Sequence, residues 1–279
     1  MRQRRIAGYP LWRKAVKPSQ TKVIQARADL TELHSPGFWL AAVVAAMLVG
    51  LSKGGLQTIG LLGVPVLSLL ISPVVAAGIL LPVYVVSDVF GLWAYRRDYS
   101  ARHLAILVPA TTIGVGLGWA AASSVSEQLV TGIVGAIGLV FALYQLLRRP
   151  VARLAQDAAV TPGLFWGTNA GFTSFVSHAG GPPFQVYVLP HNLHKAVYAG
   201  TTTILFAYVN VIKLFPYYAL GQLSLANLQV SALLLLPGAI AVYIGVRLTK
   251  ILPEVLFFRV VTWLLLLVSV KLLWDGLKG

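Results

Sequence analysis

Two long stretches without a charged side chain constrain this sequence more than any other feature. The first, 34 residues long, separates Lys53 from Asp88, and the second, 33 residues long, separates Lys213 from Arg247. Charged residues make up 11% of the chain, against about 25% in soluble domains. A hydrocarbon core about 30 Å thick is crossed by about 20 apolar helical residues. The sequence therefore predicts an all-α, polytopic helical membrane protein, and its long Leu, Val, Ala and Ile runs argue against a transmembrane β-barrel.

Basic side chains outnumber acidic ones, with 22 Lys and Arg against 8 Asp and Glu. Much of the excess falls in residues 1–36. Positive residues stay on the cytoplasmic side of a membrane and are attracted to anionic lipid, so we expect 1–36 to be a basic cytoplasmic N-terminal tail. Topology thus explains the excess charge without a nucleic-acid partner. The chain has no cysteine, which excludes disulfides, thiol catalysis and thiolate metal sites.

The apolar part of the chain reads as two halves of similar pattern. Residues that recur in the same order are Gly78, Asp88, Tyr95, Pro109 and Gly118 in the first half and Gly200, Asn210, Tyr217, Pro237 and Gly245 in the second. The first three pairs keep identical spacing. We therefore expect a first transmembrane repeat over 37–147, a polar linker over 148–161 and a second transmembrane repeat over 162–279.

Charges between matched segments indicate that the repeats are inverted. The loop after Tyr95 contains three arginines between residues 96 and 102, whereas the matched loop after Tyr217 contains no Lys or Arg. Because positively charged loops face the cytoplasm, matched loops lie on opposite sides of the membrane. Short apolar segments such as Phe184–Leu189 cannot cross alone, so the sequence predicts two inverted repeats with broken or re-entrant helices.

The first interruption of the apolar pattern, Gly50–Thr58, is rich in glycine and polar side chains. Glycine and serine let a helix unwind and let backbones approach closely. A half-helix that starts here would direct its N–H groups at an anion, and Lys53 would add a positive charge. The alternative is that Lys53 only extends to the membrane interface. The candidate binding residues of this interruption are Lys53, Gly54, Gly55, Gln57 and Thr58.

The second interruption, Ser177–Pro183, contains a histidine, two glycines and two prolines. The glycines end one helix, and proline is tolerated in the first turn of the next. His178 titrates near neutral pH, so it is a candidate for binding substrate or carrying a proton. The alternative is a structural histidine bonded to a carbonyl. Gly180 and Gly181 are the other candidate binding residues here.

A third group of polar residues follows in the second half. Asn210 and Lys213 are three residues apart and share one helical face, and Thr201 lies two turns or more before them. All three are candidate binding residues. Asp88, at the repeat position of Asn210, is the one acid in its apolar stretch. It is either a proton acceptor or the partner of Lys53 or Arg96, since an unpaired charge is costly in a bilayer.

These motifs resemble the sulfite exporter TauE/SafE family over about Gly37 to Leu277. In the first half the resemblance rests on Gly50-x-x-Lys53-Gly54, Val64-Pro65, Ser72-Pro73, Leu81-Pro82, Asp88 and Tyr95-Arg96-Arg97. In the second half it rests on His178-Ala179-Gly180-Gly181-Pro182-Pro183, Gly200-Thr201, Asn210-x-x-Lys213 and Leu220-Gly221. One departure is Gln57-Thr58, where family members often carry glycines. Polar side chains at these positions would add hydrogen bonds to an oxyanion.

The resemblance implies a multi-pass secondary carrier of the bacterial inner membrane that exports sulfite or an organosulfonate. The expected partners are the small anion and the lipid bilayer, with proton coupling through His178 or Asp88 and a homo-oligomer left open. No enzyme motif, cofactor or metal site is predicted. Two other functions remain open on the sequence: a channel for small anions, and a membrane assembly or scaffold protein without transport.

Overall fold

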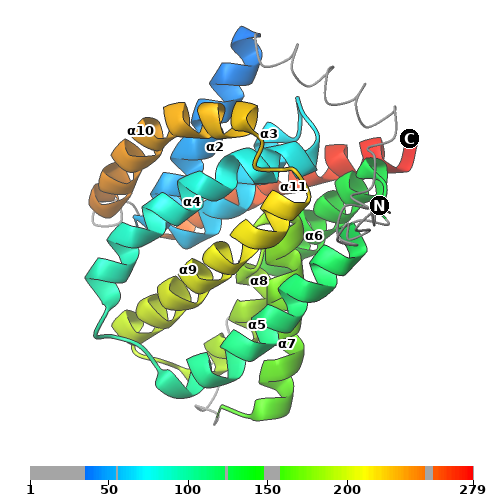
Figure 1. Ribbon diagram of the computed structural model, residues 1–279. Coiled ribbons are helices and arrows are strands. Elements are labelled where there is room, and N and C mark those ends of the chain that lie inside the picture. Colours follow the sequence, from blue (N-terminus) through cyan, green and yellow to red (C-terminus); the bar gives the residue numbers. More distant parts are fainter. Residues whose placement is uncertain (1–34, 55, 123–124, 148–157, 249–253, 279) are drawn as a thin grey trace, which may run out of the picture.

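A computed structural model describes the chain except residues 1–34, 55, 123–124, 148–157, 249–253 and 279, and every regular element it describes is helical (Figure 1). The long helices of the first half are α2 (Pro36–Lys53), α4 (Pro73–Tyr95), α5 (Ala101–Ala122) and α6 (Glu127–Leu147). Those of the second half are α7 (Val160–Ser177), α9 (Lys195–Ala219), α10 (Leu225–Leu248) and α11 (Glu254–Lys278). The predicted tail over 1–36 and linker over 148–161 lie almost wholly outside the described residues.

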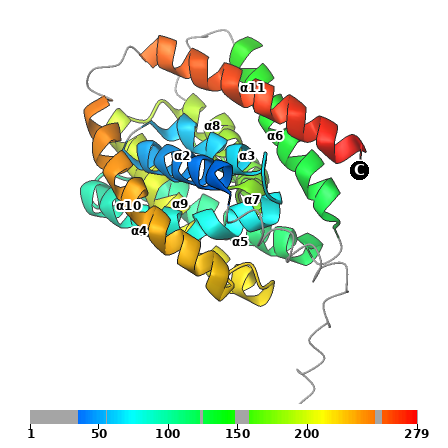
Figure 2. The same ribbon diagram turned by 90° about the horizontal axis from the view of Figure 1, so that it is seen from above.

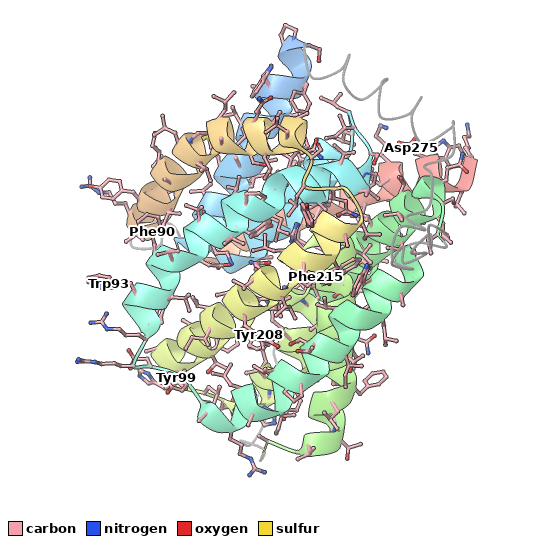
Figure 3. The ribbon with its side chains drawn as sticks, viewed as in Figure 1. Phe90, Trp93, Tyr99, Tyr208, Phe215 and Asp275 are labelled. Atoms are coloured by element: carbon pink, nitrogen blue, oxygen red, sulfur yellow. The ribbon has the colours of Figure 1, made fainter. Side chains whose placement is uncertain are left out.

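Six helices among the described residues are long and apolar enough to cross a membrane. Large apolar side chains cover the outside of the bundle. Phe90, Trp93 and Phe215 are 53%, 73% and 67% exposed, and Trp93 points away from the ribbons in Figure 3. Such an exterior is unfavourable in water but matches lipid. The prediction of a polytopic helical membrane protein is therefore confirmed.

Both predicted interruptions are breaks between helices. α2 ends at Lys53, and the chain continues as a 3₁₀ segment, Gln57–Leu62, and the short helix α3, Gly63–Leu67. α7 ends at Ser177 and is followed by the short helix α8, Gly181–Val188. His178 adopts a left-handed conformation with φ of 55°, and its N–H and that of Ala179 bond back to α7 carbonyls. This C-terminal cap stops α7 beside the cavity described below.

The helix packing is symmetric between the two halves. Each of the most extensive helix pairs that join the halves either has a counterpart with the two halves reversed or consists of two matched helices. α2 of the first half packs along α10 of the second, and α7 of the second half packs in the same way along α5 of the first. α4 packs against its counterpart α9, and α6 packs against its counterpart α11. The α6–α11 pair lies together at one side of the bundle in Figure 2. This reciprocity is what a two-fold relation between repeats requires.

Glycines form the contact surfaces of these reciprocal pairs. Added methyl groups at Gly50 and Gly54 of α2 would lie 2.1 Å and 2.5 Å from carbonyl oxygens of α10. Added methyl groups at Gly114 of α5 and Gly171 of α7 would lie 2.0 Å and 2.1 Å from carbonyl oxygens of the facing helix. Because apolar side chains gain little by leaving lipid, membrane helices depend on such close backbone packing.

The central pair, α4 and α9, runs antiparallel. Gly78 near the start of α4 packs against the Gln222 carbonyl after α9, and Gly200 near the start of α9 packs against the Asp98 carbonyl after α4. Between these contacts, the side chains of Asp88 and Asn210 bond directly to one another. A residue that touches its own repeat mate lies near the two-fold axis. Matched helices in opposite directions are the arrangement of inverted repeats.

The position of α2 bears on the membrane orientation. α2 runs parallel to α10, since Gly50 and Gly54 face Gly238 and Gly245 in the same order. It therefore begins at the end of the bundle that holds the α9–α10 loop. The arginine-rich loop at residues 96–102 lies at the other end. Pro36, the first residue of α2, and that loop consequently lie at opposite ends of the bundle.

Candidate functional site

A cavity of about 160 Å³ lies where the two breaks meet the facing parts of α4 and α9. At about 10–15 Å³ per water molecule it has room for a small oxyanion. Its polar lining comes from both repeats and consists of Ser52, Lys53, Thr58, Tyr84, Tyr95, Ser174, His178, Gln185, Tyr198, Thr202, Thr203 and Asn210. The lining extends to Tyr95 and Tyr198, so the cavity reaches the end of the bundle that carries the arginine-rich loop.

Lys53 is the cavity cation, and an ion pair holds it. Its Nζ lies 2.5 Å from Asp88 Oδ1, and the Asn210 amide donates to the other carboxylate oxygen over 2.7 Å. The Lys53 side chain is 15% exposed and that of Asp88 is 3% exposed. Among the described lining residues Lys53 is the one Lys, Arg, Asp or Glu, whereas Asp88 lies behind the wall. The cavity therefore presents positive charge while the acid is covered.

A second polar cluster closes the inner end of the cavity. His178 Nε2 lies 3.0 Å from the Ala77 carbonyl oxygen. Since a carbonyl only accepts, Nε2 carries the hydrogen and Nδ1 is the acceptor. Lys213 Nζ donates to this Nδ1 over 2.7 Å and to the carbonyl and hydroxyl oxygens of Ser174 over 3.0 and 3.1 Å. An ammonium at Lys213 thus finds an acceptor for each of its three hydrogens.

Two buried tyrosines stabilise this arrangement. The Tyr84 hydroxyl donates to the Gly60 carbonyl over 2.9 Å, and the Tyr84 ring lies 4.5 Å from the His178 ring. The Tyr217 hydroxyl donates to the Phe175 carbonyl over 2.6 Å. These bonds tie the first break to α4 and the end of α7 to α9. Both breaks are therefore held by side chains of the central helix pair.

The structure brings together part of the predicted site. Lys53, Thr58, His178, Gly181 and Asn210 line the cavity, and Asp88 and Lys213 lie behind it. Lys213 is 0% exposed. Three candidates do not line the cavity: Gly54 packs on α10, Gly180 packs on Phe206 and Ala170, and Thr201 bonds to Ser100 and Val197. Gly55 and the side chain of Gln57 lie outside the described residues.

Several lining residues escaped the sequence interpretation, chiefly Tyr84, Ser174 and Gln185. Tyr84 lies one helical turn before Asp88, and Ser174 lies one turn before His178. This i, i+4 spacing from a charged or titratable residue is the signal that points to them. Gln185 carries no such signal, because polar uncharged side chains are common throughout the chain.

The backbone offers fewer donors to an anion than the breaks suggest. α8 begins at Gly181, but the next two residues, Pro182 and Pro183, have no N–H. The Phe184 N–H is bonded to the Gly180 carbonyl. Gly181 is therefore the one residue among the first three of α8 with an N–H group. An anion in this cavity would therefore meet mainly side-chain donors, with Lys53 as the charged one.

Two inverted repeats with broken helices around a buried polar cavity form the architecture of secondary transporters. Residues 38–272 match the family described as sulfite exporter TauE/SafE, so the chain belongs to that family and is a membrane transporter. No curated protein and no solved structure matches the chain.

Proposed function

We propose that this protein is a secondary transporter of a small sulfur-containing anion, either sulfite or an organosulfonate, in the bacterial inner membrane. The observation that carries the proposal is the polar cavity with Lys53 as the one fully charged group of its described lining. The family supplies the substrate class. A bound anion would replace Asp88 as the partner of Lys53, and the Ser174 hydroxyl, which accepts from Lys213, also lines the cavity and can donate its hydrogen.

Asp88 gives this exchange a route to proton coupling. When Lys53 turns to the anion, Asp88 keeps the Asn210 amide as its hydrogen-bond donor but loses its counter-charge. A buried carboxylate without a cation favours its protonated form. One proton would then be bound with each anion. His178 is the weaker proton carrier, because its two ring nitrogens are bonded to Ala77 and Lys213.

The position of the cavity supports export. Arg102 bonds to the Ala158 carbonyl, so the arginine-rich loop and the end of the linker segment meet at one end of the bundle. These two segments, residues 96–102 and 148–161, together carry six Lys and Arg, and basic segments near helix ends face the cytoplasm. The cavity reaches this end. We therefore infer that this end of the bundle faces the cytoplasm and that the anion is loaded from there.

Uptake of radiolabelled sulfite and of sulfoacetate into proteoliposomes tests the proposed function. We expect saturable uptake and accelerated exchange when unlabelled anion is inside. Lys53→Gln should lower uptake at least tenfold, because the cavity loses its charge. Lys271→Gln is the matched control, since Lys271 is 55% exposed and pairs with Asp275 on the surface.

Lys53→Gln leaves Asp88 buried without a cation, which destabilises proteins strongly. The double variant Lys53→Gln/Asp88→Asn removes both charges and separates binding from folding. It should fold and insert yet fail to transport. Flux without exchange acceleration would favour a channel. A folded parent that moves neither anion would overturn the proposal and favour an assembly or scaffold role.

A further inference from the structure

A second, smaller cavity lies at the opposite end of α4 and α9. Its volume is about 50 Å³, and its lining includes Ala77, Gly118, Phe175, Tyr217 and Gln222. On the measure of about 10–15 Å³ per water molecule it holds only a few waters. Ala77 lies near the start of α4 and Tyr217 near the end of α9, whereas the first cavity lies along the later part of α4 and the earlier part of α9.

The two cavities are lined by repeat mates. Asp88 and Asn210, which bond to each other, are 122 positions apart in the sequence. The same offset of 122 positions relates Ala77, which lines the second cavity, to Ala199, which lines the first. This offset also relates Tyr95, which lines the first cavity, to Tyr217, which lines the second. The small cavity therefore occupies the place that the two-fold relation assigns to the counterpart of the large one.

A thin layer of bonded side chains separates the cavities. His178 lines the first cavity and bonds to Ala77 O, while Ala77 lines the second. Ser174 and Phe175 are neighbours on α7 that line the first and second cavity respectively. Lys213 holds Ser174, and Tyr217 holds Phe175. These bonds join the end of α7 to α4 and α9, so parting them would connect the two spaces.

We propose that the second cavity is the closed outer mouth of the transport path. Its gate is the layer formed by Ala77, Phe175, His178, Lys213 and Tyr217. This inference rests on the proposed function. In the opposite state of the carrier, α7 parts from α4 and α9 at this layer, and the second cavity opens on the side of the α9–α10 loop. The first cavity closes by the equivalent movement of the first repeat. Lys213 and His178 are then gate residues rather than substrate ligands.

The absence of cysteine from the whole chain makes single-cysteine labelling direct. Ala77→Cys and Ala199→Cys place matched reporters at repeat-related positions, and Ala45→Cys is a buried control outside both cavities. A membrane-impermeant thiol reagent is added to oriented vesicles from one side at a time. Ala77 is 2% exposed, so its reporter should react slowly, and only from the side of the α9–α10 loop. The Ala199→Cys reporter should react from the other side.

Tyr217→Phe provides the gate test because it removes one hydrogen bond and keeps the ring. We expect it to raise the labelling rate of the Ala77→Cys reporter by about fivefold, as loss of one net hydrogen bond predicts. The Ala199→Cys rate should fall or stay constant. Tyr218→Phe is the matched control, since Tyr218 is 73% exposed, and should change neither rate.

Labelling and transport separate the two possible failures. If Tyr217→Phe changes labelling as expected while no sulfur anion is transported, the gate stands and the proposed substrate falls. If exchange of sulfite is normal but the Ala77→Cys reporter reacts from the arginine-loop side, or its rate ignores Tyr217→Phe, the gate is overturned. Labelling of the Ala45→Cys control at a similar rate would also overturn it, because the reagent would then be reporting general loosening.

Discussion

Lys53 and Asp88 form a charge pair whose members have unequal access to the cavity. Lys53 lines it, while Asp88 lies behind the wall and is held by Asn210. A buried pair of this kind contributes little net stability, because the cost of removing both charges from water offsets their attraction. A pair that is weak overall is well suited to exchange one partner for a ligand. We therefore propose anion binding for Lys53 and proton coupling for Asp88.

Asp88→Asn tests that division of roles. The variant keeps the shape of the side chain but cannot take up a proton in this range. We expect anion exchange between the two sides to persist, while accumulation driven by a pH gradient is lost. Uptake of labelled sulfite is measured in proteoliposomes with and without the gradient, with Asp275→Asn as the surface control. Undiminished gradient-driven accumulation in Asp88→Asn would contradict the assignment.

The sequence predicted part of this site, and the limits are physical. Lys53, Asp88, His178 and Asn210 were identified because polar groups are costly in an apolar run. Lys213 met the same criterion, but the criterion indicates only that a polar partner is near. It does not tell whether the side chain lines the cavity or lies behind the cavity wall. Lys213 lies with its ammonium against Ser174 and His178 instead of lining the cavity. Whether a residue on a helical face lines a cavity depends on how the neighbouring helices pack, and a single sequence does not give that packing.

At the scale of elements, glycine positions govern how the central helices approach each other's loops. An added methyl group at Gly200 would lie 1.6 Å from the Asp98 carbonyl oxygen, and at Gly78 it would lie 2.7 Å from the Gln222 carbonyl oxygen. Backbone atoms in these loops cannot swing aside as a side chain can. The two contacts are equivalent under exchange of the repeats but differ in closeness.

Gly200→Ala should therefore destabilise the protein more than Gly78→Ala. We expect a loss of about 2–3 kcal/mol or more for Gly200→Ala and about 1 kcal/mol for Gly78→Ala, from the usual cost of overpacking. Thermal unfolding in detergent measures both. Gly116→Ala is the control, because a methyl group there meets nothing within 4 Å. Equal melting temperatures for Gly200→Ala and Gly116→Ala would show that the α9 contact is not tight.

The broken helices were predictable and their packing was not. Glycine and proline in Gly50–Thr58 and Ser177–Pro183 mark places where a helix stops, and both breaks occur there. The same residues did not show whether a glycine faces substrate or another helix. Gly54 was predicted as a binding residue but packs on α10. Glycine permits both uses for the same reason, since it has no side chain.

At the scale of the molecule, repeat mates that were visible in the sequence meet in space. Asp88 and Asn210 are bonded, and Gly78 and Gly200 make reciprocal contacts. Identical spacing could reveal the repeat, and loop charge could reveal its inversion. The side occupied by the start of α2 could not be read in that way, because basic residues occur both before α2 and in the loop after α4.

Membrane orientation is the corresponding prediction. We expect the Asp98→Cys variant to react with an impermeant thiol reagent from the cytoplasmic side, and the Ser224→Cys variant to react from the opposite side. Both residues are exposed and lie in loops at opposite ends of α4 and α9. Labelling of intact cells and of inverted vesicles distinguishes the sides. Reaction of both variants from one side would contradict the inverted arrangement.

Anion binding at Lys53 is the central claim, and ligand-induced thermal stabilisation of the purified protein tests it most directly. A ligand at about 100 times its dissociation constant stabilises the folded state by about 2.7 kcal/mol. Sulfite or sulfoacetate should raise the melting temperature of the parent and of Lys271→Gln, with chloride as the ionic control. The folded Lys53→Gln/Asp88→Asn variant should show no such rise. An equal rise in that variant would place the anion elsewhere and contradict the account.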